Sequence, residues 1–301
     1  MTAAATWRRA AAAAIAIGGL AVTGCDGGGG SQPRVSATAP SVDAALAALV
    51  PAHLKAKGKV VIATDASYAP MEFKDAQGRI VGVDVDLGEA VADRLGLDAE
   101  FKDAKFDGII GGVQAGKYDL AMSDFAATQE RQKAVDMVTY FTSGSAVAVR
   151  SGNPDRLDAA LLCGVRVAVQ AGSIQAEDVK NTRNPKCRAE GKPPIPGDGD
   201  KFDLQTQVAA ALLAGRVSAM IADNVAVNYA VKASGQIEQL GGSYNVSPSA
   251  IVIPKGDGKL AQAVQRAVQA LIDDGTYGRI LDKWDLESNA VTTSVVNGAT
   301  S

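Results

Sequence analysis

Residues 118–131 read YDLAMSDFAATQER, a pattern typical of a buried strand that leads through a loop into a helix. The first five residues predict the strand, because apolar side chains stand between turn-forming ones. Thr128 is a suitable helix N-cap, which puts Glu130 and Arg131 in the first turn. A cation there is mildly unfavourable beside the positive end of the helix dipole. Arg131 is therefore either solvated or paired with an acid, or it binds an anion together with free backbone N–H groups.

The N-terminus has the composition of an export signal. Arg8 and Arg9 precede an apolar run and then a small-residue cleavage site, so residues 1–24 are predicted to be a secretory signal peptide rather than a membrane span. Residues 22–25 (VTGC) resemble a bacterial lipobox, which implies that Cys25 carries a lipid; the alternative is an ordinary signal peptide with a chance cysteine. The Gly-, Ser-, Thr- and Pro-rich residues that follow predict a tether.

Residues 25–57 are accordingly predicted to be a lipidated tether that ends in one short amphipathic helix, with Val42, Leu46, Leu49 and Val50 on one side. The processed chain is long enough to bury one or two cores. A formal net charge of -3 argues against a nucleic-acid partner. No second apolar stretch is long enough to cross a bilayer.

The remaining cysteines, Cys163 and Cys187, form an even pair in an exported chain, which favours a disulfide over two free thiols. There is no CxxC motif, and the only histidine is His53. A zinc site is therefore not indicated, and no metal or cofactor is expected. A Cys–His or Ser–His catalytic pair would have to use His53, which precedes the predicted fold.

From Lys59 onward, strands and helices alternate, and the pattern begins again after Arg150, which predicts an α/β protein built from two units. Asp84 is predicted to cap a helix, and residues 182–201, rich in proline, are predicted to form a surface loop. Polar residues follow several predicted strands, at the carboxyl ends of the strands where open α/β sheets bind ligands. If the carboxyl ends of the strands in the two units face each other, a small polar ligand would lie between them. Arg131 would then bind its carboxylate and Asp223 its ammonium group.

Six segments in order carry a family pattern: 63–73 (ATDASYAPMEF), 81–87 (VGVDVDL), 106–119 (FDGIIGGVQAGKYD), 129–131 (QER), 167–173 (VAVQAGS) and 272–277 (IDDGTY). With these segments, the chain from about Lys59 to Asp285 resembles the family 3 bacterial solute-binding proteins of ABC importers. That family includes histidine-, lysine/arginine/ornithine- and glutamine-binding proteins. The cysteine pair resembles that of actinobacterial members.

The resemblance implies a two-lobed periplasmic-binding-protein fold of type II, with a hinge between the lobes and the ligand in the interlobe cleft. Lobe one would be residues 58–148 plus 250–287, and lobe two residues 149–249. The chain would cross between the lobes near Val149 and Ser249. Residues 288–301 are polar and are predicted to form a flexible tail.

Site residues follow position by position from the same resemblance. Arg131 matches the family arginine on the ligand α-carboxylate, and Asp223 matches the acid on its α-ammonium group. The other matches are the apolar walls Tyr68 and Phe106, the side-chain contact Asp65, the ammonium contact Ser123, and the second-lobe carboxylate contacts Ser173 and the N–H of Ile174.

Three positions depart from the family pattern. Asp124 stands where Gly or Ser is usual, Ala126 where a hydroxyl is usual, and Ile174 where Thr is usual. Asp124 is either a ligand contact, or a solvated loop acid or a residue with an N-cap-like role. The expected function is capture of a polar amino acid, basic or neutral rather than acidic, by a lipid-anchored monomer on the outer face of the membrane, and delivery to an ABC permease.

The protein is not expected to be an enzyme. The alternatives are an exported dehydratase, for which Asp124 is the one candidate acid, and a ligand-sensing receptor module.

Overall fold

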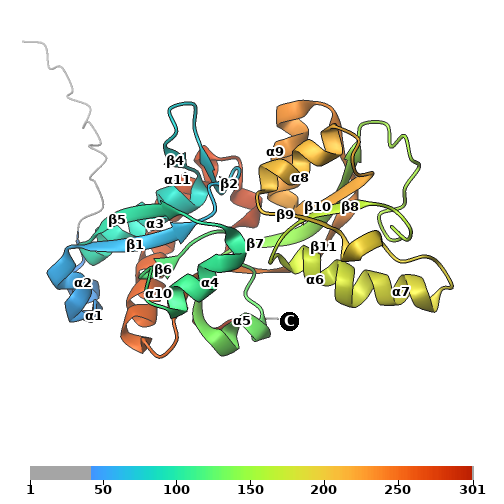
Figure 1. Cartoon of the computed structure of the whole chain (residues 1–301). Coiled ribbons are helices and arrows are strands. Elements are labelled where there is room, and N and C mark those ends of the chain that lie inside the picture. Colours follow the sequence, from blue (N-terminus) through green and yellow to red (C-terminus); the bar gives the residue numbers. More distant parts are fainter. Residues whose placement is uncertain (1–41, 300–301) are drawn as a thin grey trace, which may run out of the picture. The chain divides into compact units, whose positions relative to one another are not determined.

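One mixed sheet of eight strands runs through residues 42–299, the part of the chain that the computed structural model describes (Figure 1). Its strand order is β5-β1-β6-β11-β7-β10-β8-β9. The central strand of each lobe, β1 or β8, pairs in parallel on both sides. The predicted α/β class is therefore confirmed, and the two lobes repeat one arrangement. The predicted signal peptide, Cys25 and most of the tether lie outside the described residues.

Lobe one contains α1 (Ala44–Leu49), α2 (Ala52–Lys57), β1 (Lys59–Thr64), β2 (Ser67–Tyr68), β3 (Glu72–Lys74), β4 (Ile80–Val81), α3 (Val83–Leu95), β5 (Asp98–Asp103), α4 (Phe106–Gln114), β6 (Leu120–Ala121), α5 (Gln129–Ala134), α10 (Gly258–Asp273), α11 (Thr276–Lys283) and the 3-10 helix η3 (Glu287–Asn289). Strands β2, β3 and β4 form a separate small sheet. In α10, Leu260, Val264, Val268 and Leu271 form the buried face that packs on the core.

Lobe two contains β8 (Val167–Gln170), α6 (Ile174–Asp178), the π-helical turn η1 (Val179–Arg183), α7 (Asn184–Ala189), the 3-10 turn η2 (Pro196–Asp198), β9 (Asp200–Phe202), α8 (Gln205–Leu213), β10 (Ala219–Asp223) and α9 (Asn224–Ser234). Successive residues of β10 face opposite sides of the sheet. Met220 belongs to the core that includes Val208 of α8, and Ile221 to the core that includes Ala176 of α6. Helices therefore cover both faces, as Figure 1 shows.

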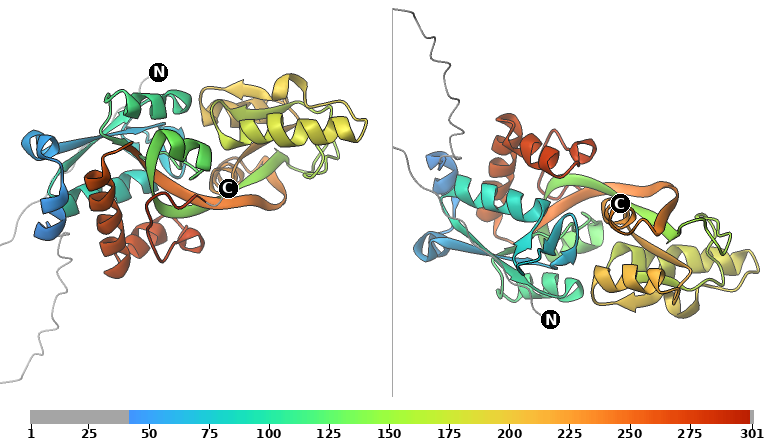
Figure 2. Two further views of the ribbon diagram at one scale, coloured as in Figure 1. Left: turned by 90° about the horizontal axis from the view of Figure 1, so that it is seen from below. Right: turned by 90° about the horizontal axis from the view of Figure 1, so that it is seen from above.

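Strands β7 (Val135–Arg150) and β11 (Ile237–Pro254) belong to both lobes, and both views in Figure 2 show them running side by side from one lobe to the other. Residues 145–148 of β7 pair with β10 of lobe two. β7 therefore already pairs with a strand of lobe two before Val149, the residue near which the sequence predicts the crossing. The strand continues without a break, so the sequence offers no boundary signal there. β11 changes register between Ser249 and Ala250.

Near the N-terminus the prediction of one helix is wrong, because Pro51 separates α1 from α2. Leu46, Val50 and Leu54 are buried against lobe one, whereas Val42 is 58% exposed. The prediction that Asp84 caps α3 is also wrong. Gly82 takes the N-cap position with φ 140°, and Asp84 is fully buried inside the first turn.

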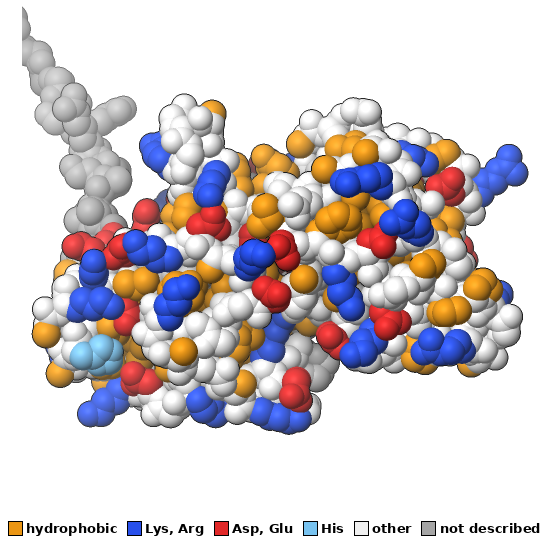
Figure 3. All heavy atoms as spheres, in the orientation of Figure 1, with side chains coloured by type: hydrophobic (Ala, Val, Ile, Leu, Met, Phe, Trp, Pro, Cys, Tyr) orange, Lys and Arg blue, Asp and Glu red, His pale blue; other side chains and the backbone are white. Residues whose placement is uncertain are grey.

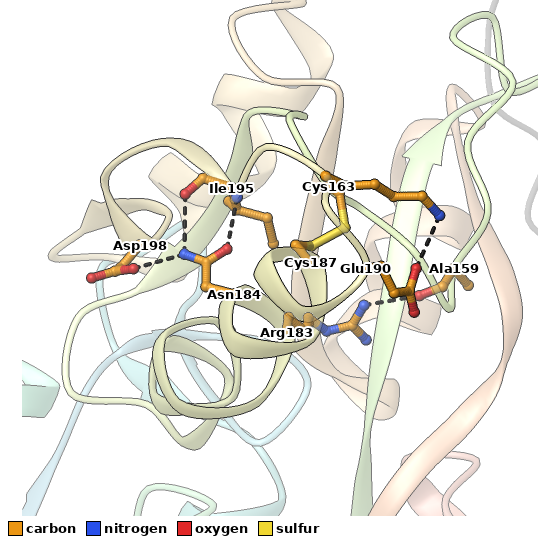
Figure 4. The surroundings of a disulfide bond; sticks show 9 residues. Ala159, Cys163, Arg183, Asn184, Cys187, Glu190, Ile195 and Asp198 are labelled. Carbon is orange, nitrogen blue, oxygen red and sulfur yellow. Dashed lines mark hydrogen bonds and ion pairs between the residues drawn. A yellow bond between two sulfur atoms is a disulfide. The ribbon is translucent and has the colours of Figure 1, made fainter.

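The predicted loop at residues 182–201 is instead helical as far as Ala189, and the predicted disulfide, which joins this helix to Cys163, is confirmed. Cys163 and Cys187 are bonded with their Cα atoms 5.5 Å apart (Figure 4). The side chain of Asn184 accepts from the backbone N of Ile195 and donates to its carbonyl. These two hydrogen bonds satisfy the backbone N–H and carbonyl of Ile195, which is buried in the proline-rich segment after α7.

The prediction of a loose tail from Ser288 is wrong for residues 288–299. The Ser294 hydroxyl donates to the carbonyl of Thr139, and the backbone N–H of Asn297 donates to the carbonyl of Met137. In lobe one, the β7 edge opposite β11 has no β10 partner, because β10 pairs only with residues 145–148. The tail fills that edge and satisfies its backbone groups.

Within the described part, no helix is long and apolar enough to cross a membrane. On the face drawn in Figure 3, acidic and basic side chains are interspersed, and neither sign forms a large patch of its own.

Candidate ligand-binding site

The polar residues that follow the ends of β1, β6, β8 and β10 come together between the lobes. Eight of the nine residues predicted to bind ligand line one cavity there: Tyr68, Phe106, Ser123, Asp124, Arg131, Ser173, Ile174 and Asp223. Two further lining residues, Gln170 and Gln175, were not predicted. The side chains nearly fill the space, leaving a cavity of about 10 Å³, close to the room one water molecule needs.

The Arg131 guanidinium is held at the lobe-one side of this cavity. Thr128 caps α5 by accepting from the backbone N of Arg131 at 3.2 Å, as predicted. The guanidinium lies 5.6 Å from the ring centroid of Phe106 and 5.3 Å from that of Phe125. It donates to the carbonyls of Ala126 and Gly172, at 3.0 and 3.2 Å. Two of its five N–H donors are thereby used, which leaves others for an anion.

Burial lowers the pKa of Arg131 to about 10, against the opposing pull of nearby carboxylates. At neutral pH the half-buried side chain therefore still carries its charge, held against two aromatic faces. A carboxylate that reaches it gains a charge-assisted and little-screened contact.

Asp223 is the opposite pole and belongs to lobe two, where it ends β10 and precedes α9. Its carboxylate accepts from the Tyr68 hydroxyl at 2.7 Å and from the Gln175 side-chain amide at 2.9 Å. Burial raises the pKa of Asp223 to about 6, and the hydrogen bonds from Tyr68 and Gln175 limit that rise. Asp223 is therefore ionised at neutral pH and can bind a cation.

Asp65, the ninth predicted residue, lies beside the cavity rather than in its lining. Its carboxylate accepts from the Gln170 amide at 2.8 Å and from the backbone N of Phe106 at 3.3 Å. The first of these contacts joins lobe one to lobe two. Burial raises the pKa of Asp65.

The two predicted serines are already hydrogen-bonded inside the protein. Ser123 donates to Glu72 at 2.6 Å. Ser173 caps α6 by accepting from the backbone N of Ala176 at 3.1 Å, and it donates to the carbonyl of Gln170 at 2.8 Å. Gly172, with φ 76°, precedes it, and a Cβ there would lie 2.8 Å from the Cβ of Asp107, so this close contact between lobes requires glycine.

Asp124 lines the cavity and is not a solvated loop acid. Its backbone has φ 43°, its side chain is 5% exposed, and neither carboxylate oxygen has a hydrogen-bond partner. Its backbone N donates to Asp84 at 3.0 Å. Burial raises the pKa of Asp124 well above its usual range, and the charges of Asp223 and Asp84 raise it further.

No group of three or more His, Cys, Asp and Glu side chains among residues 42–299 is arranged to hold a metal ion. The cavity instead presents one buried cation and several carboxyl groups from both lobes. This arrangement suits a small ligand that carries charges of both signs.

Comparison with known proteins defines the class. Residues 60–287 match the model of the bacterial extracellular solute-binding proteins, family 3, and the chain belongs to this family. The arginine-binding protein ArgT of Corynebacterium glutamicum is 32% identical over 251 residues, covering 83% of this chain and 82% of that protein. The lysine/arginine/ornithine-binding periplasmic protein of Escherichia coli is 29% identical over 234 residues, covering 75% and 86%.

Solved structures agree with the fold. An ancestral arginine-binding protein bound to arginine matches with a TM-score of 0.69 and 33% identity, covering 75% of this chain and 98% of that one. AncCDT-1, an ancestral amino acid-binding protein described as a precursor of cyclohexadienyl dehydratase, matches with a TM-score of 0.69 and 31% identity, covering 77% and 97%. The predicted two-lobed type II fold is confirmed, and this chain, like its curated relatives, is a binding protein and not an enzyme.

Proposed function

We propose that this protein captures a polar amino acid outside the cell and delivers it to an ABC-type importer. The observation that carries the proposal is the pairing of Arg131 and Asp223 across one buried cavity, with Tyr68 and Phe106 beside them. Arg131 would bind the α-carboxylate and Asp223 the α-ammonium group. Both contacts form away from bulk water, where charge pairs are weakly screened.

We further propose that basic or neutral side chains are preferred. Asp124 lines the cavity and Asp65 lies beside it, whereas Arg131 is the one basic residue in the lining. An acidic side chain would lose its hydration among carboxyl groups with no second cation to pair with, at a cost of several kcal/mol. Relatives named for arginine, and for lysine, arginine and ornithine, support this preference.

Competition calorimetry on the purified protein tests both statements. We expect arginine, lysine, ornithine and glutamine to bind more tightly than aspartate and glutamate. Glutamate and glutamine are the matched comparison, because their side chains differ mainly in charge. Tighter binding of either acidic amino acid than of all four others would contradict the preference, and no binding by any of the six would contradict the amino-acid assignment.

The lipobox supports a second proposal, that Cys25 carries a lipid which anchors the protein to the outer face of the membrane. In a Cys25→Ser variant we expect release into the medium or loss of signal processing. Membrane fractionation and intact mass measure both outcomes. A Cys25→Ser protein that stays processed and membrane-bound, as the unmodified chain does, rules the anchor out.

A further inference from the structure

A row of buried acids lies behind the cavity wall. Asp84, on α3, accepts from the backbone N of Asp124 at 3.0 Å and from the Tyr140 hydroxyl at 2.6 Å. Glu72, on β3, accepts from the Ser123 hydroxyl at 2.6 Å. Glu72, Asp84 and Tyr140 are fully buried. The amino-acid-binding role assigns none of these three groups a contact with ligand.

Asp124 is where this row meets the cavity. Its carboxyl group is buried and lines the cavity, yet neither oxygen accepts a hydrogen bond. The nearby Ser249 hydroxyl lowers the pKa of Asp124, but it does not reach hydrogen-bond geometry with either carboxylate oxygen. It shares a hydrogen bond with the Ser143 hydroxyl at 3.2 Å, in which either oxygen can be the donor. A buried carboxylate without donors is strongly disfavoured, and such a group takes up a proton instead.

Charged and titratable groups face Asp124 from six elements: Tyr68 on β2, Glu72 on β3, Asp84 on α3, Arg131 on α5, Tyr140 on β7 and Asp223 on β10. Arg131 is the one cation among them, and the carboxyl groups outnumber it. Asp223 has two side-chain donors and Asp84 has two donors, whereas Asp124 has none. The charge balance therefore leaves Asp124 as the cavity group that holds a proton.

We propose that Asp124 holds a proton in the free protein and gives it up to solvent when a cationic group of the ligand binds beside it. The O–H bond of Asp124 breaks, the proton passes to the buffer, and an N–H of the ligand donates to the resulting carboxylate. This inference rests on the proposed amino-acid-binding function and adds to it an exchange of one proton for one cation.

The exchange makes affinity depend on pH. A bound cation lowers the pKa of Asp124 relative to the free protein, so affinity rises with pH between the pKa of the bound state and that of the free state. The rise approaches tenfold per pH unit for one proton. Outside that window the Asp124 contribution to affinity is constant.

Calorimetry with arginine in two buffers of different ionisation enthalpy counts the protons. Near pH 7.5, Asp84 and Asp223, each with a pKa of about 6, are already ionised, so they contribute little. The wild type should release up to one proton per bound arginine. Asp124→Asn should release none and lose the pH dependence of its affinity above pH 7. Asp136→Asn is the control. Asp136 is a buried lobe-one acid that pairs with Lys255 outside the cavity, so this variant should keep the proton release and the pH dependence of the wild type.

Two outcomes overturn the exchange while leaving the binding function standing: arginine binds the wild type with a buffer-independent enthalpy, or Asp124→Asn still releases the proton. A ligand-free measurement is independent of both. The infrared carbonyl band of protonated carboxyl groups at neutral pH should be weaker in Asp124→Asn than in the wild type, and an unchanged band overturns the proposal. If the band weakens but no amino acid binds, the proposed function fails and the exchange fails with it.

Discussion

At the scale of single residues, Arg131 and Asp223 determine whether a zwitterion can bind. Each lines one pole of the cavity, Asp223 buried and Arg131 half-buried, and each would leave a ligand charge unpaired if removed. We expect Arg131→Ala and Asp223→Asn each to weaken amino-acid binding by about 2–5 kcal/mol. Arg131→Lys should recover part of the loss, because an ammonium keeps the charge but not the planar fork.

Lys133→Ala is the matched control for these variants. Lys133 lies on the same helix, α5, in an exposed ion pair with Glu130, so its removal should leave the affinity unchanged. Calorimetry measures affinity, and circular dichroism checks the fold. Near-normal binding by either the Arg131→Ala or the Asp223→Asn protein would refute the two-pole site.

The same scale shows what the sequence could predict of the site. The ends of predicted strands indicated Arg131 and Asp223, and the family resemblance implied the other predicted residues of the cavity lining. Gln170 and Gln175 were missed, because their partners are distant in sequence: Gln170 bonds to Asp65 across the lobes, and Gln175 bonds to Asp223 within lobe two. The position of Asp124 was left open, because a backbone φ of 43° decides where its side chain points and residue spacing carries no information on that angle.

At the scale of secondary structure, a local signal predicted the cap at Thr128, since its hydroxyl bonds to a backbone N in its own first helical turn. Errors arose where a distant partner decides the structure. Residues 288–299 look like a polar tail until the open β7 edge beside them is known. The helix α7 lies in a segment whose proline content favours a loop, and its packing depends on Asn184 and Cys187.

At the scale of the whole described domain, two long strands connect the lobes and a few side chains hold them together. Besides the cavity contacts, the backbone N of Gln205 donates to Ser67 at 3.0 Å, and Lys105 pairs with Asp203 at 2.5 Å. These contacts leave only about 10 Å³ inside. An amino acid is far larger than one water molecule, so we infer that the lobes must separate before it can enter.

A cross-link between the lobes tests this inference. Lys105 and Asp203 pair across the lobes with side chains 66% and 50% exposed, so the two thiols of a Lys105→Cys/Asp203→Cys variant are accessible to a short bifunctional thiol reagent. Cross-linked before ligand is added, the double variant should take up labelled arginine much more slowly than the untreated double variant. Cross-linked afterwards, it should retain the arginine through dilution. Each single-cysteine variant, treated identically, should exchange ligand freely. Uptake at the same rate in the cross-linked and untreated double variant would show that ligand reaches the site without separation of the lobes.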